Sequence, residues 1–406
     1  MRHYIGVDWA DAEHAVWVED ETGTKVLSRA LPQTAEAFAD WGRWLDERRA
    51  HGVELWAAIE KPEGRVVDFL LDHGVVVFPL NPKTLDRARD RFRVSGAKSD
   101  PFDAQVGAGF LRTDHGHLRP LLPASEAAQE LKGLTRDYGR QVRQQTRLLN
   151  QLTITLKEYY PRALELGGEL TSQWVREFLR VYATPAALQA LSERQWQRWA
   201  RSQRLSAERT AALWTLLQRP PLPVPPHVVR VKARRVAVLL AQLEVTSEAV
   251  EAYRKAIEDF FAALPAAKWA ASLPGGRRGT TVPMLWAELG DAAGRWQSFQ
   301  HLQGYAGAVP VTERSGKGHV VKFRFACNTQ LRYALSQFAF LSLRSSEWAR
   351  AYYHRCRQRG HTHQHALRAL GAKWLKIIFV LWSRQIPYNE EHHLASIARH
   401  QLRQPA

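Results

Sequence analysis

The stretch Tyr4-Ile5-Gly6-Val7-Asp8 is a short run of β-forming residues that ends on an acid. Two further β-rich runs, 14–18 and 25–31, follow it, and Glu21-Thr22-Gly23 between them is typical of a turn. The three runs therefore predict neighbouring strands, joined as hairpins, at the start of the chain.

Strands and helices alternate after these runs, up to about residue 120. Amphipathic spacing indicates helices, and short apolar runs that stop at turn residues indicate buried strands. The predicted elements are helices over 38–49, 65–72 and 83–92 and strands over 53–59 and 75–80. Clustered strands followed by this alternation predict an α/β domain over 1–120, in which helices pack on a mixed sheet.

The rest of the chain is predicted to be mostly helical. Between 125 and 160, apolar residues recur at helical spacing with arginines between them. This pattern indicates a long basic helix, either a coiled-coil arm or a helix packed on its own domain. A cluster of prolines over 220–226 predicts a break. We expect a helical and coiled-coil linker or oligomerisation region over 121–270, a mostly α domain over 271–395, and a tail over 396–406.

The charge of the chain is strongly unbalanced, with 57 Lys and Arg against 40 Asp and Glu among 406 residues, a net charge of +17. Such an excess points to nucleic acid or an anionic membrane surface as the partner. No apolar run reaches the roughly 18 residues needed to cross a bilayer, and Asp8 comes too early for a secretory signal, so we expect nucleic acid and no membrane. Only two cysteines are present, which excludes a disulfide framework and fits the cytoplasm.

Four acids stand where they can converge. Asp8 and Glu60 each follow an apolar run, so both would end strands of one sheet. Asp100 and Asp103 flank Pro101, which suits the first turn of a helix, and a spacing of three places both carboxylates on one helix face. Converging carboxylates repel one another unless a hard cation such as Mg²⁺ binds them, and two such ions can stabilise phosphodiester exchange. A turn role for Asp8 and a helix cap role for Asp100 stay open.

The segment 313–318, Glu-Arg-Ser-Gly-Lys-Gly, predicts an exposed flexible loop in which Ser315 is either a turn residue or a functional hydroxyl. Basic side chains in and after this loop can neutralise phosphate and fix a nucleic-acid backbone. These side chains are Arg314, Lys317, Lys322, Arg324 and Arg332.

Motifs in both the first and the last third of the chain resemble the DEDD insertion-sequence transposases, a family that includes the Piv-like DNA invertases and the bridge-RNA-guided recombinases. The segments that resemble its N-terminal domain are Gly6-Val7-Asp8, 59–64 (Ile-Glu-Lys-Pro-Glu-Gly), Asn81-Pro82 and 98–104 (Lys-Ser-Asp-Pro-Phe-Asp-Ala). The segments that resemble its C-terminal transposase domain are 273–275, 302–310 and 314–316. The resemblance therefore covers nearly the whole chain, although Arg314 stands where the family often has a serine.

The resemblance implies an RNase H-like fold for 1–120, like that of Holliday-junction resolvases, with Mg²⁺ or Mn²⁺ bound by Asp8, Glu60, Asp100 and Asp103. It implies that Ser315 is the nucleophile, and that acids and serine meet from different subunits of a homodimer or homotetramer. It also implies a structured non-coding bridge RNA that pairs with donor and target DNA. Because no His–Asp pair is evident beside Ser315, we expect the metal to activate its hydroxyl.

The predicted function is that of a transposase or site-specific DNA recombinase, acting in the cytoplasm at the nucleoid. A covalent phosphoserine conserves the phosphodiester bond energy, which agrees with the absence of a Gly-x-x-x-x-Gly-Lys-Ser/Thr phosphate loop. Two other functions stay open. One is a junction-resolvase-like nuclease that hydrolyses DNA with the acids alone, and the other is a non-catalytic nucleic-acid-binding protein.

Overall fold

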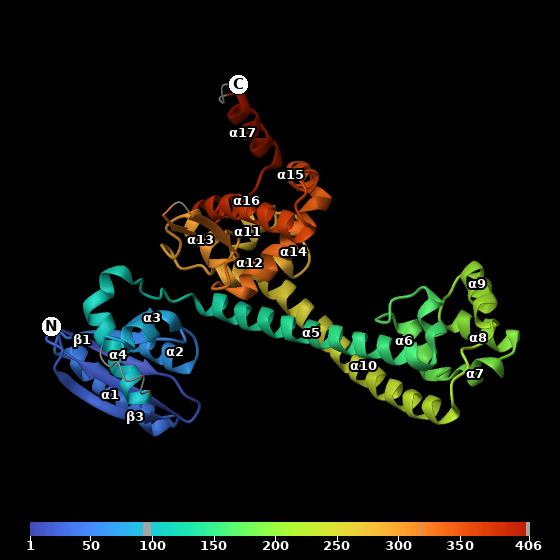
Figure 1. Ribbon diagram of the computed structural model, residues 1–406, viewed down its shortest axis with the longest axis horizontal. Coiled ribbons are helices and arrows are strands. Elements are labelled where there is room, and N and C mark those ends of the chain that lie inside the picture. The colour runs from blue at the N-terminus through green and yellow to red at the C-terminus, as the bar shows by residue number, and fades with distance from the viewer. Residues whose placement is uncertain (92–98, 317, 403–406) are drawn as a thin grey trace. The chain divides into compact units, whose positions relative to one another are not determined.

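The computed structural model describes residues 1–91, 99–316 and 318–402, shown in Figure 1. The chain divides into two compact units, Met1–Pro123 and Ala124–Ala406, and each is described by itself. Within the described residues, no helix is long and apolar enough to cross a membrane.

The first unit contains a five-stranded mixed sheet with the strand order β3-β2-β1-β4-β5. Its strands are β1 (Arg2–Asp8), β2 (Glu13–Glu19), β3 (Lys25–Pro32), β4 (Glu54–Ile59) and β5 (Val76–Pro79). The first three strands pair antiparallel, whereas β4 and β5 run parallel to β1. The predicted mixed sheet is therefore confirmed, and the predicted strand positions differ by only a few residues.

Helices cover both faces of this sheet. They are α1 (Ala35–Ala50), α2 (Arg65–Asp72), α3 (Pro82–Arg89) and α4 (Asp100–Asp114), followed by the 3₁₀ turn η1 (His115–His117). Side chains alternate along β1, so Ile5 and Val7 pack with α1 and α2, whereas Tyr4 packs with α3 and α4. The predicted helix over 83–92 is shorter than expected, and Phe92 lies outside the described residues.

Helix α4 approaches the sheet very closely at Gly6. A Cβ atom at this position would lie only 1.8 Å from the carbonyl oxygen of Ala104 and 2.8 Å from the amide nitrogen of Ala108. Glycine therefore lets the backbone of α4 lie directly on β1, which brings the first turn of α4 toward the end of that strand.

The second unit is mostly helical, as predicted, and contains a long antiparallel pair, α5 (Glu126–Tyr159) and α10 (Pro226–Ala263), seen side by side in Figure 1. Two contacts mark this antiparallel register. Glu158 forms an ion pair with Lys232, and Gln145 donates a hydrogen bond of 3.0 Å to Ser247. The proline cluster leads directly into α10, and its last residue, Pro226, occupies the first turn of that helix. The coiled-coil interpretation stays a prediction.

Short helices link α5 to α10 and share a core with that pair around Phe178 and Trp196. They are η2 (Pro161–Leu166), α6 (Gln173–Val181), α7 (Pro185–Gln189), α8 (Glu193–Ser202) and α9 (Ala207–Leu217).

The C-terminal part of the second unit packs around buried tryptophans. They are Trp286, Trp296, Trp348, Trp374 and Trp382. The elements are α11 (Ala267–Ala270), α12 (Thr281–Leu289), α13 (Phe299–Tyr305), β6 (Val311–Ser315), β7 (Gly318–Lys322), α14 (Thr329–Ser345), α15 (Glu347–Gln358), α16 (His363–Arg384) and α17 (Glu390–Leu402).

A buried acid joins α5 to this core. Glu288 of α12 is 3% exposed and accepts hydrogen bonds from Arg136 of α5 at 2.9 Å and from the side chain of Asn328 at 2.7 Å. Because Asn328 also caps α14, one carboxylate connects three helices.

The contact at Gly6 gives a test of the first unit. We expect Gly6→Ala to destabilise it by about 1–3 kcal/mol or more, because the new methyl group overlaps the backbone of α4. Gly133→Ala is the matched control, since a Cβ at this exposed position of α5 meets nothing within 4 Å and alanine favours a helix. Urea denaturation, with hydrogen exchange of the amides of β1 and α4, measures the difference; equal stability of the two variants would contradict it.

Candidate active site

Two of the acids, Asp8 and Glu60, lie at the carboxyl ends of two neighbouring strands. In the parallel pairing of β1 with β4, Val7 lies opposite Ile59, so Asp8 and Glu60 are the next residues on neighbouring strands. Alternation along β1 places Gly6 and Asp8 on the face that α4 covers, where Ala58 of β4 also packs, and Glu60 lies in the bend that follows β4. Glu60 is exposed and Asp8 is half-buried.

The other two acids lie in the first turn of α4. The helix begins at Asp100 with Ser99 as the capping residue, so the interpretation of Asp100 as the cap is wrong. The reason is that the first helical turn begins one residue earlier than Pro101 alone suggests. Asp100 is exposed, whereas Asp103 is only 2% exposed.

Asp103 is held by an arginine that was not singled out in the sequence. Arg89, the last residue of α3, donates from Nε to Oδ1 at 2.5 Å and from Nη2 to Oδ2 at 2.9 Å. The same guanidinium pairs with Asp86. The hydrogen bond to Asp103 is the main cause that raises the pKa of Arg89 above its ordinary value. Both oxygens of this buried carboxylate are thus neutralised within the chain.

The donor set fits a hard divalent cation in its chemistry, because all four ligands are carboxylate oxygens. Asp8 is half-buried, Glu60 and Asp100 are exposed, and both oxygens of Asp103 are bound by Arg89. Among the residues that the structure describes, no group of three or more His, Cys, Asp or Glu is arranged to hold a metal ion. A complete four-acid site would therefore require Asp103 to exchange Arg89 for the ion.

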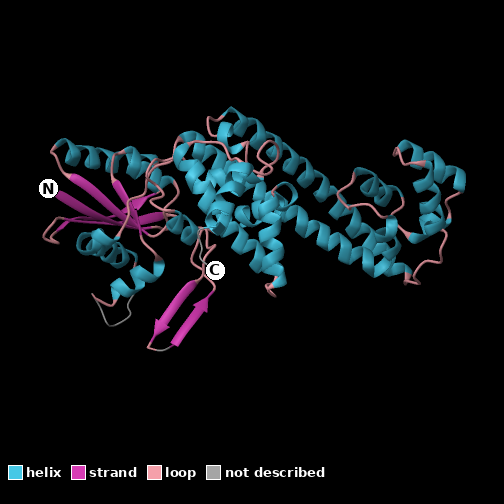
Figure 2. Ribbon diagram, turned by 90° about the horizontal axis from the view of Figure 1, so that it is seen from above, coloured by secondary structure: helices cyan, strands magenta, loops and turns pink. Residues whose placement is uncertain are grey.

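Ser315 belongs to the second unit, at the tip of a two-stranded antiparallel hairpin formed by β6 and β7 (Figure 2). It is the last residue of β6, it is exposed, and it lies opposite Gly318. Gly316 follows with φ of +54°, a conformation that favours glycine. The prediction of a flexible loop over 313–318 is wrong for Glu313 to Ser315 and for Gly318, which pair as strands because the turn between them is short.

The predicted phosphate-binding side chains differ in their exposure and in the contacts that they already make within the chain. Arg314 is exposed on β6, and Lys317 lies outside the described residues. Lys322 forms an ion pair of 2.6 Å with Glu313. Arg324 donates to the carbonyl oxygen of Val309 at 3.2 Å.

Arg332 has a structural contact of its own. It donates to the carbonyl oxygen of Arg324 and lies over the ring of Phe323, 4.6 Å from its centroid. Its side chain thus helps to fix the segment that follows β7.

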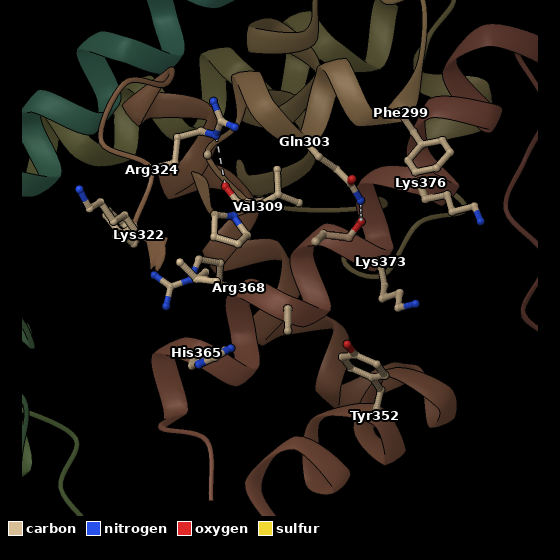
Figure 3. Close-up of a pocket in the computed structure, with 17 residues that line it drawn as sticks. Phe299, Gln303, Val309, Lys322, Arg324, Tyr352, His365, Arg368, Lys373 and Lys376 are labelled. Carbon is tan, nitrogen blue, oxygen red and sulfur yellow. Dashed lines mark hydrogen bonds between the residues drawn. The ribbon is translucent and has the colours of Figure 1, made fainter. Parts of the chain in front are cut away.

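A basic pocket at the base of the hairpin was not predicted (Figure 3). It has a volume of about 640 Å³ and is bordered by α13, the end of β7 and α16. Its basic lining residues are Lys322, Arg324, His365, Arg368, Lys373 and Lys376. A signal for it exists in the sequence, because the basic residues of 365–376 recur on one face of a helix.

Comparison with known proteins gives the family. Residues 5–161 match a family described as "Transposase", the DEDD transposases of IS110 elements, and residues 270–354 match the "Transposase IS116/IS110/IS902 family". The chain is 35% identical over 391 residues to the "Mini-circle putative transposase for IS117" of Streptomyces coelicolor, covering 92% of each chain. It is 27% identical over 394 residues to the "Insertion element IS110 uncharacterized 43.6 kDa protein" of the same organism, covering 93% of each. The chain therefore belongs to the IS110 family of DEDD transposases, enzymes that act on DNA.

Proposed function

We propose that this transposase cuts and exchanges DNA strands through a covalent link to Ser315, assisted by divalent metal at the acids of the first unit. The observation that supports the proposal is the parallel register of β1 and β4, which brings Asp8 and the residue that follows β4, Glu60, to the same end of the sheet. The helix α4, which packs on β1, carries Asp100 and Asp103 in its first turn.

The sheet topology supports an RNase H-like identity for the first unit. An antiparallel β1–β2–β3 meander, extended by two parallel strands on the other side of β1, is the arrangement that the resemblance implies for 1–120. Strand ends and a helix terminus are rigid supports, so Asp8, Asp100 and Asp103 would be held by regular elements, and Glu60 directly follows one.

Mg²⁺ or Mn²⁺ would be held by Asp8, Glu60 and Asp100, with Asp103 joining when it leaves Arg89. When bound, such an ion supplies Lewis-acid stabilisation of a phosphodiester. Until then, Arg89 keeps the buried Asp103 carboxylate neutralised, which lowers the repulsion among the four acids.

Ser315 is the proposed nucleophile. Its Oγ–phosphorus bond forms as the phosphorus–oxygen bond to deoxyribose breaks; the serine hydroxyl gives up its proton, and the departing deoxyribose oxygen takes one up. The reverse step, with a different strand end, rejoins DNA without an external energy source. Ser315 is exposed and lies beside Arg314, so a phosphate can approach its hydroxyl.

The partners follow from the charge and the family. A net charge of +17 suits DNA and RNA, and we propose that a bridge RNA pairs with donor and target DNA so that base pairing selects the sites. A homodimer or homotetramer would let the acids of one subunit meet Ser315 of another, in the cytoplasm at the nucleoid.

The nucleophile is tested by Ser315→Ala. We expect covalent protein–DNA adduct and strand exchange to fall by about 10³-fold or more, while DNA binding is retained. Thr312→Ala is the control, because it removes another exposed hydroxyl from the same strand. A denaturing gel with a substrate that traps the cleaved end measures the adduct. Cleavage by Ser315→Ala at the normal rate without adduct would instead support the hydrolytic nuclease.

The acids are tested by Asp8→Asn and Glu60→Gln. Each removes one metal ligand charge at the strand ends, so we expect about 10²-fold or greater loss of activity and weaker Mn²⁺ binding. Asp11→Asn controls for charge, since Asp11 is exposed and follows β1 closely. Electron paramagnetic resonance of Mn²⁺ gives a readout independent of activity. Chelation of divalent ions should abolish cleavage, and full activity in the presence of chelator would overturn the metal assignment.

The Arg89–Asp103 pair gives a test of stability. We expect Arg89→Met to destabilise the first unit by about 3–5 kcal/mol, because it leaves a buried carboxylate uncompensated. Arg87→Met is the control on the same helix, where the side chain is exposed. The double change Arg89→Met with Asp103→Leu should recover much of the loss in urea denaturation. A single variant as stable as the control would show that the pair contributes little.

A further inference from the structure

The basic pocket at the base of the hairpin has a composition suited to a charged ligand. Its cationic side chains come from the end of β7, from Arg324 and from one face of α16, and Figure 3 shows Arg368, Lys373 and Lys376 lining it. The described lining residues include no carboxylate. The pocket therefore concentrates positive charge in a concave site.

One face of α16 builds this charge. His365, Arg368 and Lys376 lie at helical spacing on the pocket side, with the small residues Ala369 and Ala372 between them leaving room. The opposite side of the same helix is buried in the core, through residues such as Leu370 and Trp374. Because core packing fixes the helix, the cations are held in one orientation.

These cations have no carboxylate partner in the part of the chain that the structure describes. Among the described residues, no carboxylate lies within ion-pair distance of Arg368, Lys373 or Lys376. By contrast, Lys322 at the rim is paired with Glu313. Uncompensated cations gathered in a pocket are available to an anionic ligand.

Aromatic rings stand beside the cations. Arg368 lies 4.9 Å from the ring centroid of Phe323, Lys376 lies 5.1 Å from that of Phe299, and Lys373 lies 6.0 Å from that of Tyr352. All three rings line the pocket. Alternating rings and cations give a surface that can stack on a base and bind the neighbouring phosphate.

We propose that this pocket binds an unpaired stretch of a nucleic-acid strand, with its phosphates on Arg368, Lys373 and Lys376 and a base against the aromatic rings. The proposal rests on the proposed function, which supplies nucleic acid as the partner, and adds the unpaired state of the strand. In a duplex the base faces are stacked inside, so they cannot reach the rings of a pocket of about 640 Å³. Unpaired DNA and unpaired RNA share this chemistry.

The test uses the full-length protein with Arg368→Gln, Lys373→Gln and Lys376→Gln combined. A control variant removes the same charge from exposed positions of α8, by Arg194→Gln, Arg198→Gln and Arg201→Gln. Fluorescence anisotropy measures binding of labelled single-stranded DNA, RNA of the same sequence, and the corresponding DNA duplex across a salt series. Thermal melting checks that both variants fold.

We expect the pocket variant to bind one or both single strands about tenfold or more weakly, with the salt slope reduced by about 2, and the duplex as before. The strand that is affected identifies DNA or RNA as the ligand. Equal loss for the duplex, equal loss in the α8 variant, or unchanged binding of both single strands would overturn the proposal. The trapped adduct of the unmodified protein is assayed in parallel, because its absence would mark failure of the proposed function independently of the pocket.

Discussion

The first unit depends on the close approach of α4 to β1 at Gly6. The carbonyl oxygen of Ala104 occupies the space that any Cβ at position 6 would need. This contact sets the distance between α4 and the sheet. Gly6 lies two residues before Asp8 on β1, on the same face of the sheet. The first turn of α4, with Asp100 and Asp103, thereby lies toward the end of β1 that carries Asp8, and Glu60 follows the neighbouring strand β4. One helix and two parallel strands thus bring acids that are distant in sequence toward one end of the sheet, although Asp103 is bound by Arg89.

Buried acids paired with arginine recur through the molecule. Asp103 pairs with Arg89, Glu19 with Arg112 and Glu288 with Arg136, and each of these carboxylates is nearly inaccessible. Removing either partner would leave a buried charge, so these arginines serve the fold. Some of the arginines are therefore used to pair with buried acids. Where the remaining cations lie, and not the net charge alone, decides which surface can bind nucleic acid.

The sequence predicted what short-range periodicity can encode. Alternation and helical spacing located the mixed sheet, the ends at Asp8 and Glu60, and α5 close to its observed bounds, because burial acts directly on those patterns. It did not reveal Arg89 as the partner of Asp103, since that pairing depends on how α3 packs on α4. It misjudged the strands around Ser315, because both are exposed and carry no alternation between apolar and polar residues. The basic face of α16 could have been predicted from the sequence, because its basic residues recur at helical spacing.

The hairpin that carries Ser315 has a further consequence. Every residue of β7 is exposed, including Val320 at 52% and Val321 at 56%, so the two strands are not supported by a core. An isolated two-stranded hairpin is marginally stable in water. Ser315, the proposed nucleophile, therefore stands on an element that gains a defined orientation only when another surface docks against it. Under the proposed function, strand cleavage would depend on a completed protein–nucleic-acid assembly, and its fidelity would be a property of that assembly and not of the serine alone.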